Sequence, residues 1–82
     1  METTEFYAER LEKKGVKPTA VRILVLKAMM EASYAVSLVE LETLLGTVDR
    51  STIFRTLNLF LAHHLVHDIE DGSGSPKYEG CP

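Results

Sequence analysis

The clearest hydrophobic pattern in the chain lies between residues 50 and 64. Apolar residues recur there at i, i+4, i+7 and i+8, which is the spacing of one face of an α-helix. The opposite side carries two arginines, a hydroxyl, an amide and one aromatic ring within its first turns. The apolar residues are Ile53, Leu57, Phe60 and Leu61, and the residues opposite are Arg50, Ser51, Phe54, Arg55 and Asn58. The pattern predicts a helix with one buried and one solvent-exposed face.

Two helices are predicted before it, over residues 4–14 and 20–32. Gly15 stands where a C′ glycine would end the first helix, and Thr19 can act as the N-cap of the second. The second helix is apolar on more than one face, so we expect it to be central and to contact several neighbours.

A third, short helix is predicted over residues 38–45. Ser37 and Glu40 have capping-box spacing, and Gly46 follows the helix. Asp49, or Ser51 with a slightly later start, then caps the helix at 50–64. The predicted buried side of the short helix consists of Leu38, Leu41, Leu44 and Leu45.

The C-terminal part has the alternation of a β-hairpin. Residues 65–70 alternate as a strand with Leu65, His67 and Ile69 on one face, residues 71–75 form a turn, and residues 76–79 resume as a strand. Two helices joined by a short link form a helix-turn-helix, and the added hairpin is the wing. The fold class expected is mainly α with a small β-hairpin, a winged helix-turn-helix in the order α-α-α-α-β-β, in a single domain over residues 1–82.

Composition narrows the class of protein. The chain has 82 residues, which suits one small domain, and its single cysteine, Cys81, excludes an internal disulfide and a Cys-x-x-Cys zinc knuckle. No apolar run approaches the roughly 20 residues that span a bilayer, and the acidic N-terminus has no secretory pattern. We expect a cytoplasmic protein that does not contact membranes. No phosphate-binding glycine loop, metalloprotease motif or nucleophile elbow is present, so no enzyme is indicated.

The charge balance leaves two interpretations open. The formal net charge is −3, which argues against a uniformly basic DNA-binding protein. Basic residues nevertheless gather around residues 10–22 and at the start of the helix at 50–64. Either the chain has a basic face on an acidic body, or its charges form a mixed, solvated surface.

Two segments carry a resemblance to a known family. Residues 15–22, Gly-Val-Lys-Pro-Thr-Ala-Val-Arg, and residues 51–58, Ser-Thr-Ile-Phe-Arg-Thr-Leu-Asn, resemble the opening segment and the recognition-helix motif of the ferric uptake regulator (Fur) family. Residues 65–79 are similar to its wing, and the resemblance covers about residues 6–80. It implies the DNA-binding half of a metal-responsive repressor. The family's C-terminal dimerisation and metal-binding domain is absent from this chain.

The resemblance also implies partners and cofactors. The expected partner is double-stranded DNA, specifically an A·T-rich inverted repeat. The full-length protein would be a homodimer, and this fragment would be monomeric or weakly associating. No cofactor is expected in the fragment, whereas iron(II), zinc or another divalent metal would bind the full-length protein.

The predicted DNA contacts combine the exposed helix face with the resemblance. Arg55 can reach a guanine edge or a phosphate, and Phe54 can meet a thymine methyl group. Lys17 resembles the family's lysine that enters the minor groove. The simpler alternatives are ion pairs with Glu42 or Asp49 for Arg55, helix capping for the hydroxyls, and plain solvation for the lysines. The full set of predicted DNA-binding residues is Lys14, Lys17, Arg22, Arg50, Ser51, Thr52, Phe54, Arg55 and Lys77.

Some residues depart from the family pattern. Phe54 replaces the usual tyrosine, and residues 34–36 lack the histidine that supplies one metal ligand in the family. Glu79 matches a wing-end glutamate that ligates metal, so it is a candidate ligand only within a longer protein. Two other functions therefore stay open, namely a winged-helix protein-interaction module without DNA binding and a metal-binding domain that uses the three histidines.

Overall fold

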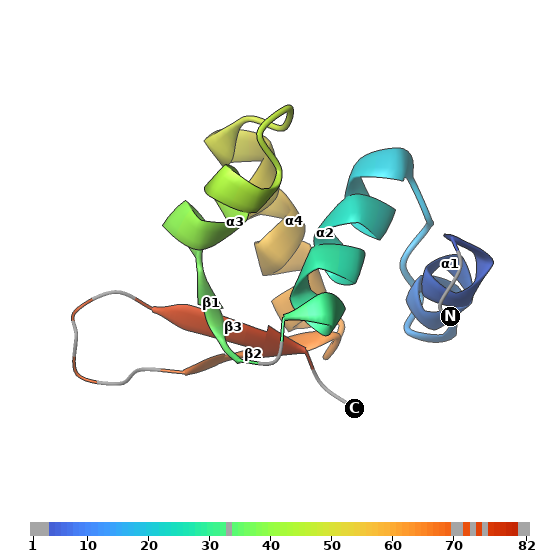
Figure 1. The fold of residues 1–82 in the computed structure, drawn as a ribbon. Helices are drawn as coiled ribbons and strands as arrows, with labels where there is room; N and C mark the ends of the chain where they lie inside the picture. The colour runs from blue at the N-terminus through green and yellow to red at the C-terminus, as the bar shows by residue number, and fades with distance from the viewer. Residues whose placement is uncertain (1–3, 33, 70–71, 73, 75, 81–82) are drawn as a thin grey trace.

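The computed structural model describes residues 4–32, 34–69, 72, 74 and 76–80, and these form helices packed on a small sheet (Figure 1). All of the predicted helices are present, with ends that differ from the prediction by at most two residues. In chain order, the elements are α1 (Thr4–Lys13), α2 (Ala20–Glu31), β1 (Val36–Ser37), α3 (Leu38–Leu44), α4 (Arg50–Ala62), β2 (Val66–Ile69) and β3 (Lys77–Gly80).

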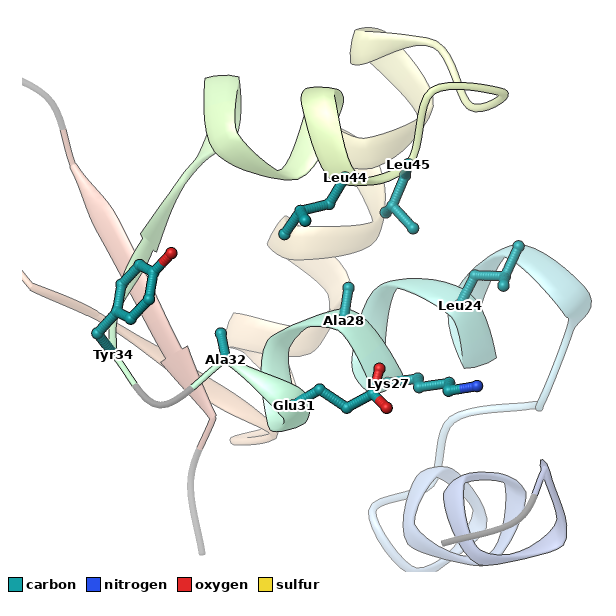
Figure 2. Close-up of a pocket in the computed structure, with 8 residues that line it drawn as sticks. All are labelled: Leu24, Lys27, Ala28, Glu31, Ala32, Tyr34, Leu44 and Leu45. Carbon is teal, nitrogen blue, oxygen red and sulfur yellow. The ribbon is translucent and has the colours of Figure 1, made fainter.

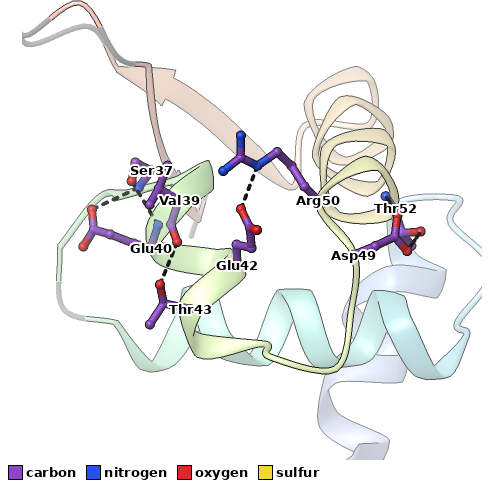
Figure 3. Close-up of polar contacts among 8 residues, drawn as sticks. All are labelled: Ser37, Val39, Glu40, Glu42, Thr43, Asp49, Arg50 and Thr52. Carbon is purple, nitrogen blue, oxygen red and sulfur yellow. Dashed lines mark hydrogen bonds and ion pairs between the residues drawn. The ribbon is translucent and has the colours of Figure 1, made fainter.

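The N-termini of three helices are closed by the side chains expected from the sequence. Thr19 Oγ1 accepts a hydrogen bond from the backbone N–H of Arg22 at 3.3 Å and caps α2. Ser37 and Glu40 form the reciprocal capping box of α3 (Figure 3). Asp49, rather than Ser51, caps α4. These caps satisfy backbone N–H groups that have no partner within the helix.

Helix α1 ends in a Schellman motif built around Gly15. The N–H of Val16 donates to the carbonyl of Leu11 at 2.9 Å, and that of Gly15 donates to Glu12 at 3.0 Å. Gly15 has φ +79°, a conformation that favours glycine, so the predicted C′ glycine is confirmed. Val16 and Leu11 are both buried, which adds the hydrophobic contact typical of this motif.

Helix α4 ends in the same motif with histidine in the glycine position. The N–H of Leu65 donates to the carbonyl of Phe60 at 2.9 Å, and that of His64 donates to Leu61 at 3.3 Å. His64 has φ +61°. Leu65 is therefore part of the C-terminal motif of α4, and the following strand begins one residue later than predicted.

This shift makes one prediction wrong. Leu65 does not share a strand face with His67 and Ile69, because it precedes the strand. Leu65 and Val66 are buried, whereas His67 is exposed. Residues 70, 71, 73 and 75 of the predicted strand and turn lie outside the described residues. Gly72 and Gly74 have φ of +87° and +85°, which suits a tight turn.

The sheet has three strands in the order β1-β3-β2, all antiparallel. The predicted fold class is confirmed, but the order becomes α-α-β-α-α-β-β, because no strand was predicted at residues 36 and 37. Val36 pairs with Tyr78, and Ser37 pairs with Lys77. A strand of two residues is too short to produce an alternating pattern, so only its pairing with β3 reveals it.

The hydrophobic core lies where the helices meet the sheet. Helix α2 contacts β3, and α4 contacts β2 (Figure 1). Ile53, Leu57 and Phe60 are fully buried, as the helical spacing predicted. The prediction for Leu44 is wrong: it is the last residue of α3, and 60% of its surface is exposed. No helix in the described ranges is long and apolar enough to cross a membrane.

Candidate nucleic-acid interface

The first turns of α4 present an exposed, polar surface beside α3. Ser51, Phe54, Arg55 and Asn58 are all exposed, and Phe54 has 46% of its surface accessible. Phe54 therefore points outward and does not fold back onto α3. This surface belongs to the second helix of the α3–α4 pair, which is the helix that enters the major groove in helix-turn-helix proteins.

The two arginines in the first turns of α4 differ in their polar contacts. The Nε of Arg50 donates to Oε2 of Glu42 at 2.7 Å, so Arg50 is tied to α3 (Figure 3). For Arg55, the described part of the chain holds no hydrogen bond or ion pair. The ion pair with Glu42, one of the two that the sequence offered for Arg55, is thus made by Arg50. The other candidate partner, Asp49, receives its main hydrogen bonds from Thr52, and the charge of Arg55 is a lesser cause of its lowered pKa. Arg55 is left with its donors available.

Thr52 takes part in the cap of α4. Its backbone N–H donates to Oδ2 of Asp49 at 3.2 Å, and its hydroxyl donates to Oδ1 at 2.7 Å (Figure 3). The hydrogen bonds from Thr52 lower the pKa of the Asp49 carboxyl below its ordinary value. While this cap is intact, the hydroxyl hydrogen of Thr52 is not free for a phosphate oxygen.

A hollow of about 430 Å³ lies between the N-terminal part of α2 and α4. Two predicted DNA contacts that are 33 positions apart in the sequence, Arg22 and Arg55, both line it. Arg22 also donates from Nη1 to the backbone carbonyl of Lys17 at 2.9 Å. The lining residues are Thr19, Val21, Arg22, Thr52, Arg55, Thr56 and Leu59.

This lining suits an anion. Guanidinium groups bind phosphate oxygens through charge-assisted hydrogen bonds, and the hydroxyl of Thr19 can add a further contact. Thr19 and Thr56 were not among the predicted DNA contacts. Thr56 is buried, with its hydroxyl donating to the carbonyl of Thr52 at 2.8 Å, so it shapes the wall. The separation of Thr52 and Thr56 by one helical turn was a usable signal.

The remaining predicted contacts lie on the loop before α2 and on the sheet. Lys14 and Lys17 are exposed on the loop between α1 and α2. Lys77 begins the central strand β3, opposite Ile69 of β2 and Ser37 of β1. The basic residues therefore come from the loop, from both helices and from the hairpin.

The candidate metal ligand Glu79 lies close to a histidine of the neighbouring strand. Its Oε2 lies 3.6 Å from Nε2 of His67, directly across the β2–β3 pair. Within the described residues, no group of three or more His, Cys, Asp or Glu side chains is placed to hold a metal ion. Since a structural zinc ion takes four ligands, this pair does not make a site by itself. Cys81 lies outside the described residues.

A second hollow, of about 470 Å³, lies between α2 and α3 and has a different character. Leu44 and Leu45 point from α3 toward Ala28 of α2 (Figure 2). Leu24 and Tyr34 extend the apolar lining and have 43% and 62% of their surfaces exposed. The other lining residues are Lys27, Glu31 and Ala32, so this surface carries no excess of positive charge.

The fold is that of ferric uptake regulators and related proteins. The Fur protein of Pseudomonas aeruginosa with manganese superposes with a TM-score of 0.82 at 25% identity, covering 90% of this chain and 59% of that chain. The Vibrio cholerae Fur superposes with a TM-score of 0.80 at 22% identity, covering 90% of this chain and 60% of that chain. The peroxide sensor PerR of Streptococcus pyogenes superposes with a TM-score of 0.79 at 15% identity, covering 98% of this chain and 58% of that chain.

These comparisons confirm, at the level of the fold, the resemblance that the two sequence motifs indicated. The chain spans about 60% of the length of these proteins. No protein-family model matches the sequence, and no curated protein sequence matches it.

Proposed function

We propose that this chain is the DNA-binding domain of a Fur-type transcriptional repressor and that α4 is its recognition helix. The main support is that Arg22 of α2 and Arg55 of α4 both line one hollow beside the exposed face of α4. The described residues of this lining include two arginines and no acidic residue, so it is locally positive although the net charge of the chain is −3. This favours the first of the two charge interpretations, a basic face on an acidic body.

Each predicted residue has a role in this proposal. Arg55 reads a base edge in the major groove, Phe54 contacts a thymine methyl group, and Arg22 binds a backbone phosphate at the hollow. Lys17 enters the neighbouring minor groove, where A·T-rich sequence narrows the groove and attracts cations. The residues left for phosphate and rim contacts are Lys14, Arg50, Ser51 and Lys77. Thr52 joins them only by exchanging the hydrogen bond of its hydroxyl to Asp49 for one to a phosphate.

The proposal extends to a longer protein. A repressor of this type would bind an A·T-rich inverted repeat as a homodimer, since two-fold protein symmetry matches the repeat. The Pseudomonas relative was solved with manganese, and a Francisella tularensis Fur was solved with iron. In this chain, Glu79 and His67 offer two ligands, and additional ligands from outside the described residues would complete a site for iron(II), zinc or another divalent ion.

Binding to duplex DNA at a series of salt concentrations tests the proposal. The chain should bind a labelled A·T-rich inverted repeat with a log–log salt slope of about −2 to −4, which corresponds to a few phosphate contacts. Amide chemical shifts should change at residues 50–58 and 14–17. A slope near zero, or shifts confined to other residues, would refute the proposal.

The apolar hollow between α2 and α3 supports a second candidate function, a protein-interaction module. Leu24, Tyr34 and Leu44 are large apolar or aromatic side chains exposed on one surface, which is a feature of protein contact sites. This function predicts that a protein partner changes the amide chemical shifts of Leu24 and Leu44 and leaves those of residues 50–58 unchanged. It also predicts that added DNA changes none of these chemical shifts. The same chemical-shift experiment therefore separates the two functions.

A further inference from the structure

The loop between α1 and α2 is held at both ends by side chains from helices. Arg22 of α2 donates from Nη1 to the carbonyl of Lys17 at 2.9 Å. At the other end, Nδ1 of His63 lies 2.9 Å from the carbonyl of Lys14. His63 is the C-cap residue of α4 and is 49 positions from Lys14 in the sequence. The loop that carries Lys14 and Lys17 is thus tied to the recognition helix.

The chemistry of the His63 contact is determined by its partner. A carbonyl oxygen can only accept a hydrogen bond, so Nδ1 of His63 must carry the hydrogen. The ring of His63 also lies beside Gly15: a Cβ added at Gly15 would be 3.7 Å from Nδ1, which is an ordinary van der Waals contact. Glycine is therefore favoured at position 15 by the left-handed turn and is not required by the neighbouring ring.

We propose that His63 is a positioning residue that sets the place of Lys17 relative to the recognition surface of α4. This inference rests on the proposed DNA binding and specifies how two of its contacts are coupled. Arg55 in the major groove and Lys17 in the adjacent minor groove must engage one duplex together. Ordering a flexible loop on binding costs conformational entropy and lowers affinity. A loop that is already fixed to α4 avoids this cost.

The test is a double-mutant cycle with Lys17→Ala. His63→Leu keeps the bulk of the side chain and removes the donor, whereas His63→Asn places an amide N–H close to the position of Nδ1. Against an A·T-rich duplex, His63→Leu should weaken binding about three- to tenfold, as expected for loss of one hydrogen bond. In the Lys17→Ala background its effect should be clearly smaller, because only the contact of Lys14 is then left to be disturbed. His63→Asn should restore most of the affinity.

His64→Asn is the matched control. It changes the neighbouring histidine, which is exposed, to another residue that tolerates positive φ. Its affinity should equal that of the parent chain. If His63→Leu weakens binding equally with and without Lys17, His63 has only a general structural role and the inference is overturned.

Hydrogen exchange tests the coupling without DNA. In His63→Leu, the amides of residues 14–17 should exchange faster while those of the α2 and α4 core keep their protection. Unchanged loop exchange would overturn the inference regardless of DNA binding. If the parent chain binds no duplex at all, the proposed function fails, and loop exchange alone decides whether His63 positions the loop.

Discussion

Replacement of Arg55 by alanine is the sharpest test of how α4 would read DNA. Arg55 is exposed, and within the described residues no hydrogen bond or ion pair holds its guanidinium group. Its removal should therefore change the free energy of unfolding by no more than about 0.5 kcal/mol. Any effect on DNA binding then reports the contact with DNA and not damage to the fold.

The expected magnitude follows from the kind of contact. A bidentate contact from arginine to guanine contributes about 1–3 kcal/mol of discrimination, which corresponds to a preference of about 5- to 150-fold. Arg50→Ala is the matched control from the same helix. Arg50 is already paired with Glu42 at 2.7 Å, so its loss removes a surface ion pair worth about 0.2–1 kcal/mol and a smaller share of DNA recognition.

Fluorescence anisotropy with two duplexes measures the difference. One duplex carries the A·T-rich inverted repeat, and the other has the same composition in shuffled order. Arg55→Ala should lower affinity for the repeat much more than for the shuffled duplex, whereas Arg50→Ala should lower both by similar factors. Equal losses for Arg55→Ala, with a salt slope reduced by about one, would show that Arg55 contacts only phosphate.

Three further predictions concern the fold that holds this surface. Gly15→Ala should lower the free energy of unfolding by about 1 kcal/mol and His64→Gly should raise it by about 0.5–1 kcal/mol, because both positions have left-handed backbone conformations. Urea denaturation above the ordinary pKa of histidine measures both changes. A change of the same sign in the two variants would contradict this prediction. The pKa of Asp49 is lowered in the folded chain, so the stability that Asp49 contributes is present above its unfolded pKa and is lost as pH falls through the folded pKa. Asn at position 49 can still cap α4 but does not titrate. Asp49→Asn should therefore remove this part of the pH dependence of the urea midpoint. Leu57→Ala should cost about 2–5 kcal/mol of unfolding free energy and Leu44→Ala less than about 0.5 kcal/mol, and equal losses would place Leu44 in the core.

The sequence by itself determined the features that depend on neighbours a few residues apart. The caps of α2 and α3, the C′ glycine at position 15 and the buried stripe of Ile53, Leu57 and Phe60 all follow from spacing within one or two turns. Such interactions are formed between residues that the chain necessarily keeps close. The order of these elements was enough to predict a winged helix.

Only the tertiary structure decided features that depend on distant segments meeting. The two residues of β1 become a strand because β3 pairs with them, and Leu44 is exposed because α3 ends where the core does not reach. Glu42 pairs with Arg50 and leaves Arg55 available, although the sequence offered Arg55 the same partner. Arg22 and Arg55 line one hollow, and Nδ1 of His63 lies 2.9 Å from the carbonyl of Lys14. Packing fixes these pairings, because no local spacing specifies which of several compatible partners the folded chain brings within a few ångströms.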